Sequence, residues 1–387
     1  MKIAYVIGGL PFGGVENWLL DLTLRFRDRE DVEAVVVNVS GTGIKGPEYV
    51  QKGIRVIDVC DSKKGLKTFK FGTALKLRKV LVDEAPDVIH TLHFSGDYFG
   101  RIAAVGLGIP VVTHIRNIKR QTKKYRRFAN KFLCRFTDVF LSVSAQAERE
   151  CVALDHNVCG KPSLVFYNAA DPEKLRVGGV DLKAEYGAGD FIISGIGRFV
   201  PQKNFDLLIK AFALIAARYP QASLVLLGDG GEMDSLRELV RSLELEKRVV
   251  FPGYRSDVPR FMRSTDILVM PSDYEGLPIT HIEALFCGVP AVVSRFVPSL
   301  EIAAEASLVC RREPEHIAEQ ISRLIEDDGL RDRLSHKALE IAPEYSMDNY
   351  VRRLVDFYGA LIKNGKNGSD DFKRFDQAKG GVQACAE

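Results

Sequence analysis

The chain has 387 residues, 46% of them hydrophobic and 27% charged, and its 54 Lys and Arg exceed its 51 Asp and Glu by three. This composition is typical of a globular protein, and the length favours two domains. No apolar run reaches the roughly 18 residues of a membrane-spanning helix and no signal peptide is evident, so a cytoplasmic location is expected. A net charge of +3 does not indicate a nucleic-acid partner.

The first half alternates short apolar strands with helical segments, which predicts a parallel sheet covered by helices on both faces. The segment KIAYVIGG at 2–9 predicts a strand, and VENWLLDLTLRF at 15–26 predicts a helix. Further strands are predicted at EAVVVNVS, RVIDVC, DVIHTL, IPVVTH, DVFLSVS and SLVFYN. We therefore expect a Rossmann-like domain over residues 1–170.

A glycine-rich loop follows the first strand, where GGLPFGGVEN places Gly13 and Gly14 directly before a helix. Glycines let backbone N–H groups approach an anion, and a helix N-terminus adds partial positive charge, so the loop favours phosphate. The segment GTGIKG at 41–46 matches the dinucleotide pattern, but Pro47 follows at once and no long helix opens there. It is a weak signal of a nicotinamide site.

Two histidines stand at predicted strand ends. The HTLH segment at 90–93 has a spacing that could suit zinc, but no cysteine or acidic pattern accompanies it, so no metal site is predicted. His93 is instead assigned to the acceptor side of a cleft. For His114, in VVTHIRN, a core histidine and a cleft histidine both stay open.

The segment KRQTKKYRRFANKFLCR at 119–135 carries eight lysines and arginines interleaved with aromatic residues. Two interpretations stay open for it: a solvated helix face, or a surface that rests on an anionic membrane.

The second half repeats the alternation after a glycine-bearing, charged linker at 171–185. FIISGIG at 191–197 predicts a strand, and further strands are predicted at SLVLLGDG, RVVFPG, DILVMPS, PAVVS and SLVC. We expect a second Rossmann-like domain over 186–345, a helix at 346–363 that packs back across the domains, and a disordered tail at 364–387. Two such sheets, facing each other, would bind a ligand in a cleft at the carboxyl ends of their strands.

The second half places cations and carboxylates on loops that follow strands. Arg198 and Lys203 lie in GRFVPQKN, where a guanidinium and an ammonium suit a diphosphate. Gly228 lies in LLGDGG, which could hold phosphate or make a tight turn. In DYEGLPITHIEAL, Glu275 precedes a helix and Glu283 lies inside it, too far apart for an acid/base pair on one atom. Carboxylates at two points suit hydroxyl pairs of a sugar and of a ribose.

The run from GRFVPQKNFDLLIKAF through LVLLGDG to DYEGLPITHIEALFCGVPAVVS resembles the donor domain of the family four glycosyltransferases, also called glycosyl transferases group 1. GGVEN and VFYNAADPEKL fit the same family. The resemblance implies the GT-B fold, in which a Rossmann-like acceptor-binding domain and a nucleotide-sugar-binding domain face each other across a cleft. NAAD in place of NG-hydrophobic-D, and the absence of a proline after GDGG, depart from its pattern, and His281 has no role that we can assign.

The resemblance also implies residue roles. Arg198 and Lys203 would bind the donor diphosphate, Glu275 the donor sugar and Glu283 the ribose. His114 would lie near the transferred sugar. The remaining donor-side positions are the glycine loop, the turn before the second glutamate and the loop beside the base: Gly13, Gly14, Gly228, Gly276, Leu277, Pro278, Tyr254 and Arg255.

The implied activity is transfer of a sugar, with retention and without a metal ion, from a UDP- or GDP-sugar to a saccharide or lipid-linked acceptor in polysaccharide or lipopolysaccharide synthesis. No cofactor other than this donor is implied. The basic segment at 119–135 would place the enzyme peripherally at the inner face of the plasma membrane. Two alternatives remain: a sugar-nucleotide epimerase of the same architecture, and an inactive scaffold.

Overall fold

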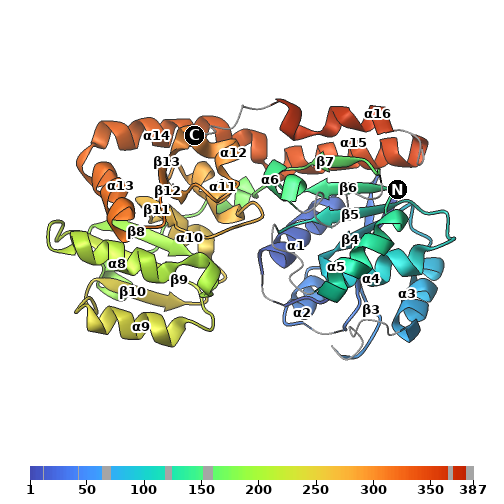
Figure 1. The fold of residues 1–387 in the computed structure, drawn as a ribbon, viewed down its shortest axis with the longest axis horizontal. Coiled ribbons are helices and arrows are strands. Elements are labelled where there is room, and N and C mark those ends of the chain that lie inside the picture. The colour runs from blue at the N-terminus through green and yellow to red at the C-terminus, as the bar shows by residue number, and fades with distance from the viewer. Residues whose placement is uncertain are drawn as a thin grey trace. The chain divides into compact units, whose positions relative to one another are not determined.

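The computed structural model describes residues 1–11, 13–41, 43–62, 71–117, 124–150, 160–364 and 369–380. The chain divides into two compact units, and each is described by itself (Figure 1). The first unit comprises residues 1–169 and 347–387, and the second comprises residues 170–346.

The first unit is built on a parallel seven-stranded sheet in the order β3-β2-β1-β4-β5-β6-β7. Its strands are β1 (Lys2–Ile7), β2 (Glu33–Asn38), β3 (Val56–Asp58), β4 (Val88–Leu92), β5 (Val111–Ile115), β6 (Val139–Ser142) and β7 (Ser163–Val165). Its helices are α1 (Gly14–Arg27), α2 (Gly46–Gln51), α3 (Phe71–Glu84), α4 (His93–Ala104), α5 (Lys124–Leu133), α6 (Ala145–Ala147), α15 (Met347–Asn364) and α16 (Ser369–Phe372). Apolar residues of α3, α4 and α5 share one core with strand residues such as Val6 and Val37.

The second unit repeats the plan with six parallel strands in the order β10-β9-β8-β11-β12-β13. The strands are β8 (Phe191–Ile196), β9 (Ala222–Leu227), β10 (Val249–Gly253), β11 (Ile267–Met270), β12 (Ala291–Ser294) and β13 (Ser307–Cys310). The helices are α7 (Leu182–Tyr186), α8 (Phe205–Ala216), α9 (Met233–Ser242), α10 (Val258–Arg263), α11 (Ile279–Cys287), α12 (Leu300–Ala303), α13 (Pro314–Glu326) and α14 (Asp328–Ile341).

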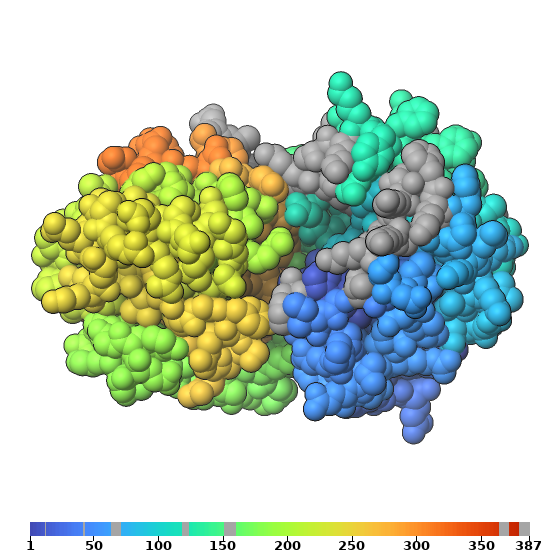
Figure 2. Space-filling view, turned by 90° about the horizontal axis from the view of Figure 1, so that it is seen from below, coloured from blue at the N-terminus to red at the C-terminus, as the bar shows by residue number. Residues whose placement is uncertain are grey.

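Alternating strand residues face two separate cores in this unit, as a pleated strand requires. On β9, Leu224 and Leu226 pack with α8, α9 and α13, while Val225 and Leu227 pack with α7, α10 and α11. Figure 2 shows α9 as part of the yellow outer surface of the unit. The strands expected from the sequence are confirmed.

Both sheets have a point where the strand order reverses. It lies between β1 and β4 in the first unit and between β8 and β11 in the second. Loops that leave the carboxyl ends of such neighbouring strands diverge to opposite faces and leave a crevice for a ligand. The glycine loop and His93 therefore belong to one switch point, and the loops that carry Lys203 and Glu275 belong to the other.

The C-terminal segment differs from the disordered tail that its composition predicted. Helix α15 belongs to the first unit, where it packs against α1, and residues 369–380 pack beside it. Phe372 and Phe375 are buried against Phe357 of α15. Asp376 accepts a hydrogen bond from the backbone N–H of Val165, so the segment also covers the edge strand β7. Tertiary burial of two phenylalanines overrides the polar composition.

The predicted linker at 171–185 lies inside the second unit. It contains a short 3-10 helix (Pro172–Leu175) and most of α7, and Leu175 and Leu182 are buried. The GTGIKG segment, whose Thr42 lies outside the described residues, leads into α2, which has only six residues. Such a helix is too short for a dinucleotide fold, in agreement with the weak signal expected.

Candidate functional site

In the second unit, hydrogen bonds tie the loop after β8 to the loop after β11. Asn204 has a left-handed backbone, and its side-chain amide donates to the carbonyl of Pro271 and to Asp273 Oδ1 at 3.0 and 2.7 Å. Gln202 Nε2 donates to the carbonyl of Tyr274 at 2.6 Å. These bonds hold the two predicted diphosphate and sugar loops in one rigid junction.

The junction brings Lys203 and Glu275 together, with Nζ 2.6 Å from Oε1. Both side chains are largely buried, at 16% and 11% exposure. A Cβ on Gly197 would lie 3.2 Å from Lys203 Cε, so the glycine leaves room for the lysine stem. Arg198 follows this glycine and is exposed. Of the two cations predicted to bind the diphosphate, Arg198 is therefore exposed, and Lys203 is paired with the Glu275 carboxylate.

The turn before α11 has the geometry expected of it. Gly276, Leu277 and Pro278 are buried, and Pro278 is the N-cap residue, so α11 begins at Ile279. Glu283 is the fifth residue of this helix and is half-buried. The two glutamates therefore lie on different parts of one loop-helix segment, as predicted.

Gly228 makes the close approach that its loop requires. Its φ is 150°, a value that side chains rarely adopt, and a Cβ there would lie 1.9 Å from the carbonyl oxygen of Gly197. The glycine thus packs the loop after β9 against the loop that leads to Lys203. This close approach gives the glycine a structural reason, and the phosphate contact stays a prediction.

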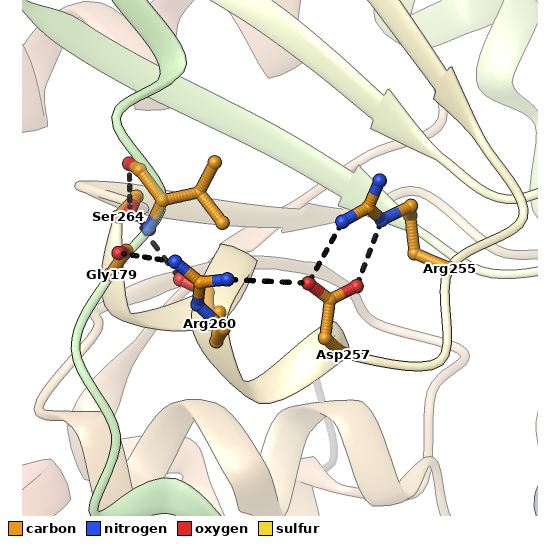
Figure 3. A network of polar contacts seen from close by, with 6 residues as sticks. Gly179, Arg255, Asp257, Arg260 and Ser264 are labelled. Carbon is orange, nitrogen blue, oxygen red and sulfur yellow. Dashed lines mark hydrogen bonds and ion pairs between the residues drawn. The ribbon is translucent and has the colours of Figure 1, made fainter. Parts of the chain in front are cut away.

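Arg255, predicted to edge the base, is already engaged. Its guanidinium donates to both oxygens of Asp257 at 2.8 and 2.9 Å, as Figure 3 shows. In the same network Arg260 lies 3.9 Å from Asp257 and donates to the carbonyl of Gly179. The structure gives Arg255 a role in holding this loop, while the neighbouring Tyr254 is 48% exposed.

His281, which had no assigned role, is a structural histidine. Its ring nitrogens lie 2.7 Å from Ser299 Oγ and 3.2 Å from Ser307 Oγ, and the ring is buried. Burial lowers the pKa of His281 to about 4, so the ring is neutral at pH 7. It joins α11 to the segments that carry the two serines.

In the first unit, the glycine loop and His93 meet at Glu16. Gly13 is extended, and a Cβ there would lie 2.3 Å from Glu16 Oε2, so a side chain at this position would have to displace the Glu16 carboxylate. His93 Nδ1 lies 3.8 Å from Glu16 Oε1. His93 has a φ of 63°, an uncommon value for a non-glycine residue and one that is concentrated at functional sites. Gly14 begins α1.

His114 lies at the end of a buried chain of hydrogen bonds. His114 Nδ1 lies 3.1 Å from His90 Nε2, His90 Nδ1 lies 2.5 Å from the Tyr358 hydroxyl, and that hydroxyl lies 2.9 Å from Tyr5. Burial lowers the pKa of His90 to about 3; burial and then nearby Arg116 lower the pKa of His114 well below its usual value. One ring nitrogen of His114 is thus satisfied in the core.

Within the described ranges, no group of three or more histidine, cysteine, aspartate or glutamate side chains could hold a metal ion. Nor does any helix in those ranges have the length and apolar character needed to cross a membrane. A cavity of about 610 Å³ lies at the amino ends of β1 and β2, beside Lys2 and Glu33. Ligands of such sheets bind at the opposite, carboxyl edge, so we assign it no role.

Several residues of these sites were missed by reasoning from the sequence. Asn204 and Gln202, in PQKN, fix the position of Lys203, and Glu16, in GGVEN, fills the space above Gly13. These residues lie inside the motifs PQKN and GGVEN, whose pattern does not indicate which side chains they contact. Tyr358 carried no signal, because nothing local connects it with His90.

Two family models match the chain. Residues 12–174 match Glycosyltransferase Family 4, and residues 183–340 match Glycosyl transferases group 1.

Among similar proteins, the UDP-Gal:alpha-D-GlcNAc-diphosphoundecaprenol alpha-1,3-galactosyltransferase of Escherichia coli is 29% identical over 274 residues, which are 64% of this chain and 68% of that protein. The N-acetyl-alpha-D-glucosaminyl L-malate synthase of Bacillus anthracis is 28% identical over 193 residues, 48% of this chain and 50% of that protein. The chain thus spans about half the length of this second relative.

The crystal structure of Anabaena Alr3699/HepE in complex with UDP has a TM-score of 0.81 to this chain at 23% identity, covering 93% of this chain and 100% of that one. At this identity the likeness concerns the fold. The predicted fold class, two Rossmann-like domains of the GT-B type, is confirmed. The cleft between the domains stays a prediction.

Proposed function

The chain belongs to the family four glycosyltransferases, and from that premise we propose that it transfers a sugar from a UDP-sugar to a hydroxyl of a lipid-linked, diphosphate-bearing saccharide. The name of the Escherichia coli relative supports both substrates, and UDP is bound in the Anabaena structure. Such a reaction belongs to the synthesis of cell-surface polysaccharide or lipopolysaccharide at the cytoplasmic face of the membrane.

The observation that carries the proposal is the junction of Lys203 with Glu275 at the switch point of the second unit. We propose that Lys203 and Arg198 bind the diphosphate, Glu275 the sugar hydroxyls and Glu283 the ribose hydroxyls. The backbone amides of Gly276 and Leu277 lie in the turn between the two glutamates. A carboxylate that accepts two hydroxyls and cations that neutralise phosphate fit a nucleotide sugar.

The proposed reaction proceeds with retention. The bond between the anomeric carbon and the diphosphate oxygen breaks, and the acceptor oxygen forms its bond to that carbon on the same face. The acceptor proton passes to the departing diphosphate, so UDP is the only other product. Negative charge grows on the diphosphate as the bond breaks, and Lys203 and Arg198 stabilise it there. Because these cations do so, we propose that no divalent metal is needed.

On the acceptor side we propose roles for three residues of the first unit. His93 and Glu16 would position the acceptor hydroxyl, because they meet beside the glycine loop at the carboxyl ends of β1 and β4. His114 would contact the transferred sugar through Nε2.

We further propose that α5 rests on an anionic membrane. Lys124, Arg127 and Lys131 are exposed, together with Phe128 at 77% and Phe132 at 52% exposure. Cations mixed with exposed aromatic rings suit an interface between anionic headgroups and acyl chains. Residues 119–123 of the predicted patch lie outside the described residues.

The test is a purified-enzyme assay with a panel of UDP- and GDP-sugars, measuring nucleotide release with and without an N-acetylglucosaminyl diphosphate lipid. We expect release of UDP that depends on both substrates, and a product in which the donor's anomeric configuration is retained. Conversion of a nucleotide sugar without an acceptor would instead identify an epimerase. No turnover with any combination, while UDP still binds, would identify an inactive scaffold.

A further inference from the structure

A buried cation lies beyond the end of β5. Arg116 is 9% exposed, and its guanidinium carbon lies 3.7 Å from the centre of the Trp18 ring. Within the part of the chain that the structure describes, Nε and Nη1 of Arg116 have no hydrogen-bond partner. A buried, charged donor without a partner loses its hydration with no compensating hydrogen bond, so native proteins normally supply a partner.

The unpaired donors gather around one indole. Trp18 Nε1 is also buried without a partner among the described residues, and so is His114 Nε2. The His114 ring meets the Trp18 ring edge-on with centroids 5.5 Å apart, and the Tyr350 ring meets it with centroids 5.6 Å apart. The Tyr350 hydroxyl is likewise buried without a partner among the described residues, so four neighbouring side chains around the indole each present an unsatisfied polar atom.

The charge of Arg116 persists despite its burial. Desolvation lowers the pKa of Arg116 to about 10, opposed by Tyr350 and Glu16, so the guanidinium is still protonated at pH 7. A guanidinium and an indole N–H can only donate. Two vacant N–H groups on a planar guanidinium, with an indole N–H beside it, match the oxygens of a phosphate group.

We propose that Arg116 and Trp18 form a receptor for a phosphate group of the acceptor, a proposal that rests on the function proposed above. The receptor stands in the first unit, whereas the cations assigned to the donor diphosphate stand on loops of the second. It follows β5, the neighbour of β4, whose carboxyl end leads to His93. The receptor and the proposed acceptor-positioning residue therefore share one edge of the sheet.

Trp18 provides the probe, because it is the only tryptophan in the chain. The enzyme is first saturated with UDP, so that the donor site of the second unit is filled. Inorganic phosphate is then titrated at constant ionic strength against chloride, and tryptophan emission is followed. We expect a saturable change in emission for the wild-type enzyme, because phosphate binds within contact of the indole.

The variant Arg116→Gln removes the charge and should weaken phosphate binding about tenfold or more. Arg116→Lys keeps the charge without the planar fork and should bind with intermediate affinity. Arg29→Gln, an exposed arginine of the same unit paired with Asp31, is the matched control and should titrate as wild type. An unfolding midpoint and a far-UV circular dichroism spectrum equal to those of the wild type show that each variant is folded in both units.

A second measurement uses N-acetylglucosamine joined to an alkyl chain either directly or through a diphosphate. The wild-type enzyme should have the lower KM for the diphosphate form, and Arg116→Gln should raise that KM toward the value of the neutral form. Inorganic pyrophosphate and a prenyl diphosphate in micelles distinguish the source: tighter binding of the prenyl form indicates a lipid-borne phosphate, and equal binding indicates recognition of the phosphate alone. Either result supports the receptor.

The inference is overturned if the enzyme binds UDP and transfers sugar but phosphate does not change Trp18 emission. It is also overturned if Arg116→Gln binds phosphate with the same affinity as the wild type. In that case the proposed function stands. If no nucleotide sugar is turned over with any acceptor, the proposed function fails, whatever the phosphate titration shows.

Discussion

Lys203 Nζ lies 2.6 Å from Glu275 Oε1, so the cation proposed for the diphosphate and the carboxylate proposed for the sugar form an ion pair. A diphosphate would compete with the carboxylate for the ammonium. Once Lys203 turns to phosphate, Glu275 regains its lone pairs for sugar hydroxyls. If both proposed roles hold, binding of the diphosphate and binding of the sugar would be coupled, because each would require the ion pair to open.

Replacement of Lys203 tests its role in the leaving-group chemistry. In Lys203→Ala we expect a higher KM for the donor and a kcat lower by roughly 10²-fold, because charge on the diphosphate grows as the bond breaks. Lys210→Ala, which removes an exposed lysine paired with Asp206 on α8, should behave as wild type in the same steady-state assay. An unchanged kcat in Lys203→Ala would refute the catalytic assignment.

Gly228 should tolerate no side chain. Gly228→Ala places a Cβ against the Gly197 carbonyl at a φ of 150°, so we expect a loss of roughly 1–3 kcal/mol in the free energy of unfolding. UDP affinity should fall with it, because Gly197 borders Lys203. Gly231→Ala, in the same loop with open space around its Cα, is the control. Denaturant titration and UDP binding measure both effects, and equal stability of the two variants would contradict the prediction.

His281 should make the fold sensitive to acid. Its pKa is about 4 in the folded state and about 6.5 when exposed, so the unfolded chain binds the proton more readily. Its stabilising effect is fully present above pH 6.5 and is lost as the pH falls from 6.5 toward 4, at about 1.4 kcal/mol per pH unit. The buried His90 and His114 add to the slope in the same direction.

The measurement is the unfolding free energy between pH 8 and pH 5. His281→Gln should reduce the slope of the unfolding free energy against pH by the contribution of about one proton. His336→Gln, at an exposed position on α14, is the matched control. If the slope survives unchanged in His281→Gln, another group is responsible for it.

Truncation after residue 364 should loosen the first unit. It removes Phe372 and Phe375 from the surface of α15. It also removes Asp376 and Gln377, whose side chains accept hydrogen bonds from the backbone N–H groups of Val165 and Tyr167. We expect faster hydrogen exchange at those two amides and a lower unfolding midpoint. Lys373→Ala, an exposed site on the same segment, is the control. If hydrogen exchange at these two amides is the same in the truncated and the full-length chain, the tail is disordered, as its composition predicts.

Helix α5 should bind anionic vesicles through its charges. The triple variant Lys124→Gln, Arg127→Gln and Lys131→Gln loses three cations, each contributing about 1 kcal/mol near an anionic surface. Co-sedimentation with anionic vesicles should therefore fall about 100-fold in affinity. A triple variant at exposed cations of the second unit, Lys183, Lys210 and Arg241, is the control. If the affinity of the wild-type protein for vesicles does not depend on salt or on lipid charge, the membrane proposal is wrong.

The sequence by itself determined the strands, the two-domain plan and the loops that carry function. Each strand is a short apolar run with turn residues beside it, and each loop motif is local, so both follow from residues close together in the chain. The positions of Lys203, Glu275 and Glu283 were predictable for the same reason: GRFVPQKN and DYEGLPITHIEAL each read as a loop that enters a helix.

Only the tertiary structure decided which of those side chains meet. The Lys203–Glu275 pair, the His90–Tyr358 bond and the Arg116–Trp18 stack each join residues from separate elements, and their partners depend on strand order, which no local pattern encodes. Burial likewise ordered the polar tail around Phe372 and Phe375, because packing against α15 outweighs the local preference for disorder.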